Sequence, residues 1–267
     1  MLKSFLILLF TAIFMLTLCM TAPAHAAHPL ATDDTGTQGK LKFQTETTAE
    51  FGWDRENEHG ITTKSSIQTL NVAVTAGILD SIDLALSYPY IWQRIEDNAG
   101  NKLDNSGLSD LSLSLKWRFL ELGTTSFAIK PCITLPTANH DRNLGAGRAS
   151  YGATMISTIE FKPVTVHANI GYTNQKYTDI DADGSRGHLW SLSLAGTVEV
   201  QKGLQLVAEV GTTTNPDRRS TTWPTFMTGG VIYSAFENLD LSLGVKGGLN
   251  APATDIALLA GVTIRFP

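Results

Sequence analysis

The chain has 267 residues, a formal net charge of -5 and a sequence pI near 5.7, and 43% of its residues are hydrophobic. An acidic balance without a basic patch or a binding motif argues against a nucleic-acid partner. The 23 glycines and the 8% aromatic content are typical of strands and turns, and no segment after the N-terminal region has the length of a transmembrane helix.

Residues 1–26 have the pattern of a secretory signal peptide. Lys3 supplies a positive charge, residues 5–20 form a short apolar run, and Ala24-His25-Ala26 offers the small residues that signal peptidase reads. We expect cleavage after residue 26 or 27. An uncleaved anchor is the first alternative, for which the apolar run is short. A lipoprotein modified at Cys19 is the second, for which the preceding residue is not small.

Residues 27–39 follow as a polar N-terminal periplasmic segment, and we expect the barrel to occupy residues 40–267. The segment could cap the periplasmic mouth of the barrel, enter its lumen or remain a disordered tail. Cleavage of the signal peptide leaves Cys132 as the only cysteine, so no intrachain disulfide is expected.

Apolar and polar residues alternate along about a dozen segments, most clearly from Asp110 to Leu120. Successive residues of a strand point to opposite faces, so one face could lie against lipid while the other holds cations. Alternation and turn residues predict twelve strands: Lys40–Trp53, Lys64–Ile78, Ile82–Trp92, Leu108–Leu120, Thr125–Leu135, Tyr151–Phe161, Val164–Asn174, Leu189–Gln201, Leu204–Thr214, Trp223–Phe236, Leu239–Asn250 and Asp255–Phe266.

The predicted connections alternate in length. Those after even strands have two to four residues, as in Lys162–Pro163, whereas those after odd strands are mostly long and polar, as in Asp54–Thr63 and Gln93–Gly107. Short periplasmic turns and long outer loops are typical of outer-membrane barrels, and a soluble sandwich has no reason to keep this alternation. The sequence therefore predicts an all-β protein, a 12-stranded antiparallel transmembrane β-barrel of the outer-membrane type.

Aromatic residues cluster at the two ends of the predicted strands, as expected for belts at the two membrane interfaces. The outer ends carry Trp53, Trp92, Tyr151, Tyr172, Trp190 and Trp223, and the inner ends carry Phe119, Phe127, Phe161 and Phe266. The penultimate Phe266 resembles the C-terminal signal of the barrel-assembly machinery, which we expect as a partner during biogenesis. Outer-membrane lipids are the other expected partner.

Three stretches resemble the outer-membrane family described as "Putative MetA-pathway of phenol degradation". They are His28 to Gly36 followed by Gly39-Lys40, Gly107 to Leu120, and Leu135-Pro136-Thr137, with Ala138 where the family usually has glycine. These motifs are structural: a strand start, a periplasmic turn and a loop entry. The resemblance implies a transporter-like barrel that passes aromatic or other hydrophobic compounds.

The predicted lumen holds charges of both signs in near balance, so a one-signed lining for a charged substrate is not expected. Pairing of these charges across neighbouring strands is the simpler interpretation. Twelve strands enclose a narrow path at most. The candidates for a constriction near mid-height are Glu46, Lys116, Lys130, His167, Glu209 and Lys246.

No cofactor, metal or catalytic site is predicted. His167 and Asn169 share a strand face, but the next position on that face is Gly171 and not a nucleophile, so a membrane-embedded lipid hydrolase is disfavoured. The run of Asp179, Asp181 and Asp183 resembles half of a calcium loop without its final glutamate, and a solvated loop is the simpler interpretation.

The predicted function is passive uptake of small, aromatic or hydrophobic, solutes across the cell outer membrane. A structural or plugged barrel without transport is the alternative that the sequence leaves open.

Overall fold

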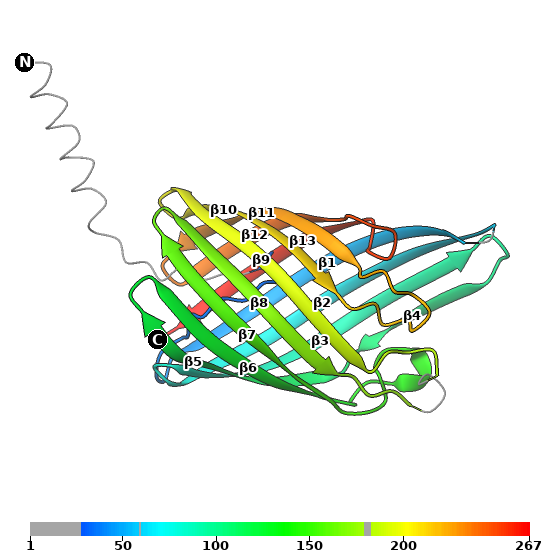
Figure 1. Cartoon of the computed structure of the whole chain (residues 1–267), viewed down its shortest axis with the longest axis horizontal. Helices are drawn as coiled ribbons and strands as arrows, with labels where there is room; N and C mark the ends of the chain where they lie inside the picture. Colours follow the sequence, from blue (N-terminus) through cyan, green and yellow to red (C-terminus); the bar gives the residue numbers. More distant parts are fainter. Residues whose placement is uncertain (1–27, 59, 179–182) are drawn as a thin grey trace, which may run out of the picture.

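The computed structural model describes residues 28–58, 60–178 and 183–267, which form one antiparallel β-barrel (Figure 1). Its strands are β1 (Phe43–Glu58), β2 (Ile61–Leu79), β3 (Ile82–Asp97), β4 (Lys102–Leu108), β5 (Leu111–Leu122), β6 (Thr125–Leu135), β7 (Ser150–Phe161), β8 (Val164–Asn174), β9 (His188–Gln201), β10 (Leu204–Thr213), β11 (Thr225–Phe236), β12 (Leu239–Gly248) and β13 (Ile256–Phe266). A 3₁₀ turn, η1 (His140–Arg142), lies between β6 and β7.

The barrel is closed by its first and last strands. β1 pairs with β13 from Phe43↔Phe266 to Trp53↔Ile256, and closure leaves no sheet edge exposed to lipid. β4 and β5 both pair with β3, one after the other, so thirteen segments occupy twelve positions around the ring. The 12-stranded antiparallel barrel expected from the sequence is confirmed.

The expected signal peptide, residues 1–26, lies outside the described residues. Within the described ranges, no helix combines the length and the apolar character needed to cross a membrane.

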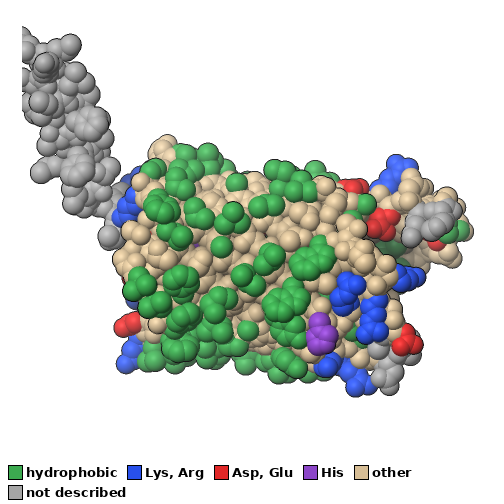
Figure 2. Space-filling view, viewed as in Figure 1, with side chains coloured by type: hydrophobic (Ala, Val, Ile, Leu, Met, Phe, Trp, Pro, Cys, Tyr) green, Lys and Arg blue, Asp and Glu red, His purple; other side chains and the backbone are tan. Residues whose placement is uncertain are grey.

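The alternation of β5 places its apolar residues outside. Leu113, Leu115, Trp117 and Phe119 are between 37% and 47% exposed, whereas the side chain of Lys116 between them is only 14% exposed. Figure 2 shows hydrophobic side chains spread over the barrel wall, with charged side chains gathered toward its two ends. These apolar residues face outward, because the solvent along this wall is lipid.

The aromatic residues lie where the interfacial belts require them. Trp53, Trp92 and Trp190 are exposed on the outward face at the end with the long loops, and Phe161 and Phe266 are exposed at the end with the short turns. Barrels of this type have their long loops on the outside, so we take the end with the long loops as the outer end.

Two stretches that the sequence predicted as loops, Asp54–Thr63 and Gln93–Gly107, are largely strands. β1 continues to Glu58 before β2 returns, and β3 continues to Asp97 before β4 returns. These hairpins extend toward the loop end of the barrel (Figure 1). Their outward face carries polar side chains, so the apolar alternation on which the prediction relied is absent there.

The predicted strand Leu108–Leu120 is interrupted. Tyr90 pairs with Leu108 and Ser87 with Ser112, so the two β3 residues between them face the three residues 109–111. This is a β-bulge, and it turns Asp110 inward, where its carboxylate accepts hydrogen bonds from the backbone N–H groups of Ala138 (3.0 Å) and Ala146 (2.9 Å). The bulge thereby holds the loop of residues 136–149.

Candidate functional site in the barrel lumen

All six candidate constriction residues lie on strands and have their side chains on the inward face. Residues that pair directly across an antiparallel ladder point to the same side, and the partners of five of the candidates are buried. These partners are Thr263 for Glu46, Asp83 for Lys116, Thr158 for His167, Thr228 for Glu209 and Ala257 for Lys246. The sixth, Lys130, pairs with Thr154.

The N-terminal segment, here residues 28–39, lies in the lumen between these walls. His28 Nδ1 is 2.9 Å from Ser242 Oγ of β12, and the N–H of Thr35 donates to Thr158 Oγ1 of β7 at 3.1 Å. The N–H of Gln38 donates to the carboxylate of Asp83 on β3 at 3.0 Å. These three strands stand on different sides of the ring, so the segment crosses the interior. Of the three placements that the sequence left open, the lumen is the one observed.

Asp33 of the segment binds two of the candidate lysines at once. Its carboxylate oxygens lie 2.7 Å from Lys116 Nζ on β5 and 2.7 Å from Lys130 Nζ on β6. The Asn169 amide, oriented to satisfy both groups, pairs with the Asp33 main chain at 2.7 Å and 3.0 Å. Charge-assisted hydrogen bonds of this kind are about twice as strong as neutral ones.

Glu209 binds the segment from the opposite wall. Its carboxylate accepts hydrogen bonds from the N–H of Thr32 at 2.6 Å, from the N–H of Ala31 at 3.0 Å and from the Thr32 hydroxyl at 2.5 Å. This carboxylate is 5% exposed, so the backbone donors supply the partners that burial of a charge requires. Glu209 is therefore a binding residue for the segment.

The wall is shaped around the segment by inward-facing glycines. A Cβ atom at Gly244 would lie 2.7 Å from Pro29 Cβ, and one at Gly261 would lie 2.6 Å from His28 Nδ1. A Cβ atom at Gly77 would lie 1.8 Å from the carbonyl oxygen of Gly39. No side chain fits at these positions while the segment is docked.

The other three candidates are held differently. Lys246 pairs with Glu50 and lies 5.8 Å from the ring centroid of Phe226, and His167 Nδ1 is 3.0 Å from Thr158 Oγ1. Glu46 interacts electrostatically with Asp33 and with the two lysines that Asp33 binds. The six residues therefore do not form one ring: Lys116, Lys130 and Glu209 engage the segment directly.

Pairing of charges across the wall accounts for only part of the lumen. Arg265 pairs with Asp240 on the adjacent strand, and Lys246 pairs with Glu50 across β13. Lys116 and Lys130 find their counter-ion on the segment instead. The interpretation that wall charges pair among neighbouring strands is wrong for these two lysines, because the N-terminal segment supplies the carboxylate.

The inward face becomes apolar toward the outer end. Ile67, Ile91 and Phe226 have inward positions there, as their ladder partners Gly52, Gly107 and Gly211 do. Ile67 is 42% exposed although it faces the interior, so there is open space beside it. Leu144 of the loop 136–149 is 3% exposed, and a Cβ atom at Gly107 would lie 2.7 Å from its Cδ1 atom. We call Ile67, Ile91, Leu144 and Phe226 the apolar vestibule.

The sequence did not single out Asp33, Thr32 or the apolar vestibule. The segment has no alternation, and the only signal for its placement was the pair Asp33-Asp34 preceding a barrel with two inward mid-height lysines. The inward apolar residues interrupt the polar face of their strands, a departure that a search for charges overlooks.

Among the described residues, no three histidine, cysteine or carboxylate side chains are grouped so that they could hold a metal ion. Residues 179–182 of the calcium-like run lie outside the described part of the chain.

Solved structures with the same architecture are outer-membrane barrels. The COG4313 outer membrane channel from Pseudomonas putida F1 is 15% identical, with a TM-score of 0.68 over 89% of this chain and 100% of that chain. The translocator domain of the autotransporter NalP from Neisseria meningitidis is 12% identical, with a TM-score of 0.53 over 87% and 91%. The KdgM porin in complex with disordered oligogalacturonate is 7% identical, with a TM-score of 0.53 over 85% and 100%. At these identities the likeness shows the fold alone.

No curated protein matches the sequence. The sequence profile of one family matches residues 29–266, which cover the lumen segment and nearly the whole barrel. A closed barrel with a lipid-facing apolar wall resides in the outer membrane. The chain belongs to the family described as "Putative MetA-pathway of phenol degradation".

Proposed function

We propose that this protein is a passive outer-membrane channel for small, aromatic or hydrophobic, solutes. The observation that carries the proposal is the apolar vestibule at the outer end of the lumen, where the inward-facing Ile67 is 42% exposed. Sites for small ligands are mostly apolar with a few placed polar groups, and Phe226 with the Lys246 ammonium over its ring provides both. The family description, which refers to phenol degradation, points to the same solute class.

The N-terminal segment is the gate in this proposal. It fills the middle and the inner part of the lumen, so a solute that enters the vestibule passes only when the segment moves. Its ionic contacts are few and concentrated at Asp33 and at Glu209, and breaking one of these sites releases one part of the segment.

Single-channel conductance of the refolded protein in planar bilayers tests the proposal. We expect rare current steps for the wild type and more frequent steps for Asp33→Asn, which keeps the shape of the side chain but removes its charge. An aromatic acid should block the steps briefly, whereas acetate at the same concentration should not. The double variant Ile67→Ser with Phe226→Ser should shorten the blockages.

A plugged structural barrel is the second candidate, and the docked segment is the observation that favours it. A folded protein that stays silent with Asp33→Asn and with residues 28–39 deleted would establish this candidate and refute the channel. Discrete steps that aromatic acids leave unchanged would retain a channel but refute the solute class.

We further propose that the barrel has no catalytic role. The Ser193 hydroxyl is hydrogen-bonded to the Thr32 hydroxyl (2.9 Å) and not to a base. The Thr158 hydroxyl, which lies 3.0 Å from His167 Nδ1, is 3% exposed and accepts a hydrogen bond from the N–H of Thr35, so the docked segment covers it. The proposed boundaries remain a signal peptide of residues 1–26, the N-terminal segment and the barrel from residue 40, with Phe266 as the contact for the assembly machinery.

A further inference from the structure

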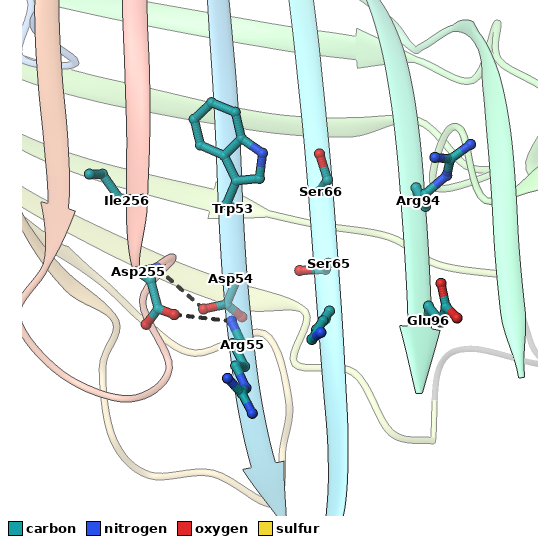
Figure 3. A pocket seen from close by; sticks show the side chains of 10 residues that line it. Trp53, Asp54, Arg55, Ser65, Ser66, Arg94, Glu96, Asp255 and Ile256 are labelled. Carbon is teal, nitrogen blue, oxygen red and sulfur yellow. Dashed lines mark hydrogen bonds between the residues drawn. The ribbon is translucent and has the colours of Figure 1, made fainter. Parts of the chain in front are cut away.

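The outer surface of the barrel carries a pocket at the outer ends of β13, β1, β2 and β3 (Figure 3). Its volume is about 390 Å³. The residues of β3 that line it are Arg94 and Glu96 but not Ile95 between them, so the pocket is on the outward face of the sheet and not in the lumen. This pocket is separate from the apolar vestibule.

Two rows of cross-strand neighbours build the pocket. The inner row runs through Ile256, Trp53, Ser66 and Arg94, which pair in that order across β13, β1, β2 and β3. The outer row runs through Arg55, Lys64 and Glu96 on β1 to β3, and Lys102 of β4 continues it beyond the lining of the pocket. The pocket therefore has an indole and an aliphatic side chain on its membrane side, and the cations Arg55 and Lys64 on its outer side. The carboxylates of Asp54 and Asp255 also line it; each accepts a backbone hydrogen bond, from the N–H of Asp255 (3.2 Å) and of Arg55 (3.1 Å) respectively.

The outer row holds three cations and one carboxylate. That carboxylate, Glu96, is bound by Lys102 at 3.0 Å, and the neighbouring Arg94 is bound by Asp104 at 2.7 Å. Arg55 and Lys64 stand directly opposite each other, and within the described ranges no carboxylate forms an ion pair with either. Like charges directly opposite in a ladder are destabilising, so an anion bound between them would relieve the repulsion.

The position of the pocket along the membrane normal indicates which anion it meets. Trp53 is 42% exposed on the outward face and belongs to the outer aromatic belt, where indole rings sit at the level of the lipid headgroups. Arg55 is two residues farther from the membrane on the same face. The outer leaflet of this membrane consists of a glycolipid with phosphate groups on its sugar headgroup, and acyl chains lie below them. Basic pockets on membrane proteins bind such headgroups.

We propose that this pocket binds the phosphorylated headgroup of an outer-leaflet glycolipid. The phosphate lies between the Arg55 guanidinium and the Lys64 ammonium, and the sugar and the first carbons of the acyl chains pack on Trp53 and Ile256. Arg provides a forked donor pair to phosphate oxygens and Lys a point charge, so the two together hold one phosphate from two sides. The bound lipid fixes this part of the wall in the membrane, a role independent of transport.

Native mass spectrometry of the full-length mature protein with bisphosphorylated lipid A tests the proposal. The variant Arg55→Gln with Lys64→Gln should bind this lipid roughly tenfold or more weakly, as expected when charge-assisted hydrogen bonds are lost. Dephosphorylated lipid A should bind the wild type and this variant alike. The matched control Arg219→Gln with Asp217→Asn removes an exposed cation together with its counter-ion outside the pocket and should stay within about twofold of the wild type, since exposed ion pairs contribute little.

Thermal unfolding in lipid-free detergent gives a second readout that does not depend on binding. The variant Arg55→Gln with Lys64→Gln should unfold at the same temperature as the wild type or higher, because it lacks the repulsion between the two cations. Equal lipid A binding by this variant and the wild type would overturn the proposal. Displacement of the lipid by inorganic phosphate at matched concentration would also overturn it, since the site would then bind a free ion and not a lipid headgroup.

Discussion

Asp33 determines the charge balance in the middle of the lumen. Lys116 and Lys130 are on adjacent strands and both point inward, so without a shared counter-ion they would repel each other across the ladder. Removing one partner of a largely buried ion pair leaves the other charge uncompensated, which makes such pairs costly to break. The two inward lysines thus have a counter-ion only when the segment is docked.

Removing the two lysines should make the lumen prefer cations. In Lys116→Ala with Lys130→Ala, the carboxylates of Asp33, Asp34 and Glu46 lose their nearest positive charges, so anionic charge dominates the path. We expect the reversal potential in a salt gradient to shift toward the equilibrium potential of the cation.

The control for this experiment is Lys202→Ala, which removes a cation from a short periplasmic turn and should leave the reversal potential near that of the wild type. An unchanged reversal potential in the double variant would show that ions do not pass these lysines.

At the residue scale, the sequence predicted which side chains face inward but not what they bind. Parity along a strand places Lys116, Lys130 and Glu209 in the lumen, because alternate residues share a face. Their partners come from a stretch without periodicity, more than seventy positions away in the chain, and only the tertiary structure brings them together.

The loop of residues 136–149 is held by one strand irregularity. The Asp110 carboxylate caps two of its N–H groups, and the Ser109 hydroxyl donates to the carbonyl of Leu144 at 2.6 Å. The bulge that turns Asp110 inward therefore also positions Leu144, a member of the apolar vestibule.

Asp110→Ala should release this loop. Loss of two hydrogen bonds to a carboxylate destabilises the docked loop by about 2–4 kcal/mol locally, while the barrel ladder remains. Trypsin cleavage after Arg142 should become faster in the folded protein, and amide exchange at Ala138 and Ala146 should rise. Asp141→Ala, which changes an exposed carboxylate in the same loop, should leave both rates unchanged. Equal protection in the two variants would contradict the anchoring role of Asp110.

At the element scale, the apolar/polar periodicity predicted most strands. The errors lie in the parts of the strands that extend beyond the membrane. The extended hairpins of β1 with β2 and of β3 with β4 carry polar pairs such as Arg94 with Asp104, which read as loop residues in a linear sequence. Within the membrane the outward residues must be apolar, so the alternation of apolar and polar residues identifies the strands. Above it both faces are wet, so hydrogen-bonded strands and loops have similar compositions.

The barrel and its segment together form the packed interior of the whole molecule. Most hydrophobic side chains face lipid, so the close-packed volume inside the ring is made mainly of polar side chains, of a few buried apolar ones such as Ile156, Val207 and Ile232, and of a piece of main chain. The glycines opposite Pro29 and His28 show that the wall and the segment are complementary in shape.

Gly244→Ala should displace the segment, because the tightest contacts of the new methyl group are with Pro29. The new methyl group would lie 2.7 Å from Pro29 Cβ, and overpacking of this kind costs about 1–3 kcal/mol. We expect faster hydrogen exchange at Ala31 and Thr32, whose N–H groups bind Glu209, and more frequent current steps.

Gly229→Ala is the matched control, because a Cβ atom at Gly229 meets nothing within 4 Å. If Gly244→Ala left both the exchange rates and the current at wild-type values, the segment would not be held by the shape of the wall.

At the scale of the whole molecule, the sequence predicted the barrel architecture but not the position of the N-terminal segment in the lumen. Closure, strand number and orientation follow from a repeated pattern, so a few errors in single strands do not change them. The path of one aperiodic segment depends on a few contacts such as that of Asp33 with its two lysines, and no repetition marks them in the sequence.

The order in which this molecule can be built follows from where the segment binds. Its partners come from β3 at one extreme and β12 at the other, so its binding site exists only after the chain has formed the whole ring. Residues 28–39 leave the ribosome before any strand of the barrel and therefore reach their final position last. A docked N-terminal segment therefore indicates that the barrel is complete. A folding intermediate whose first and last strands have not yet paired lacks the full binding site for the segment.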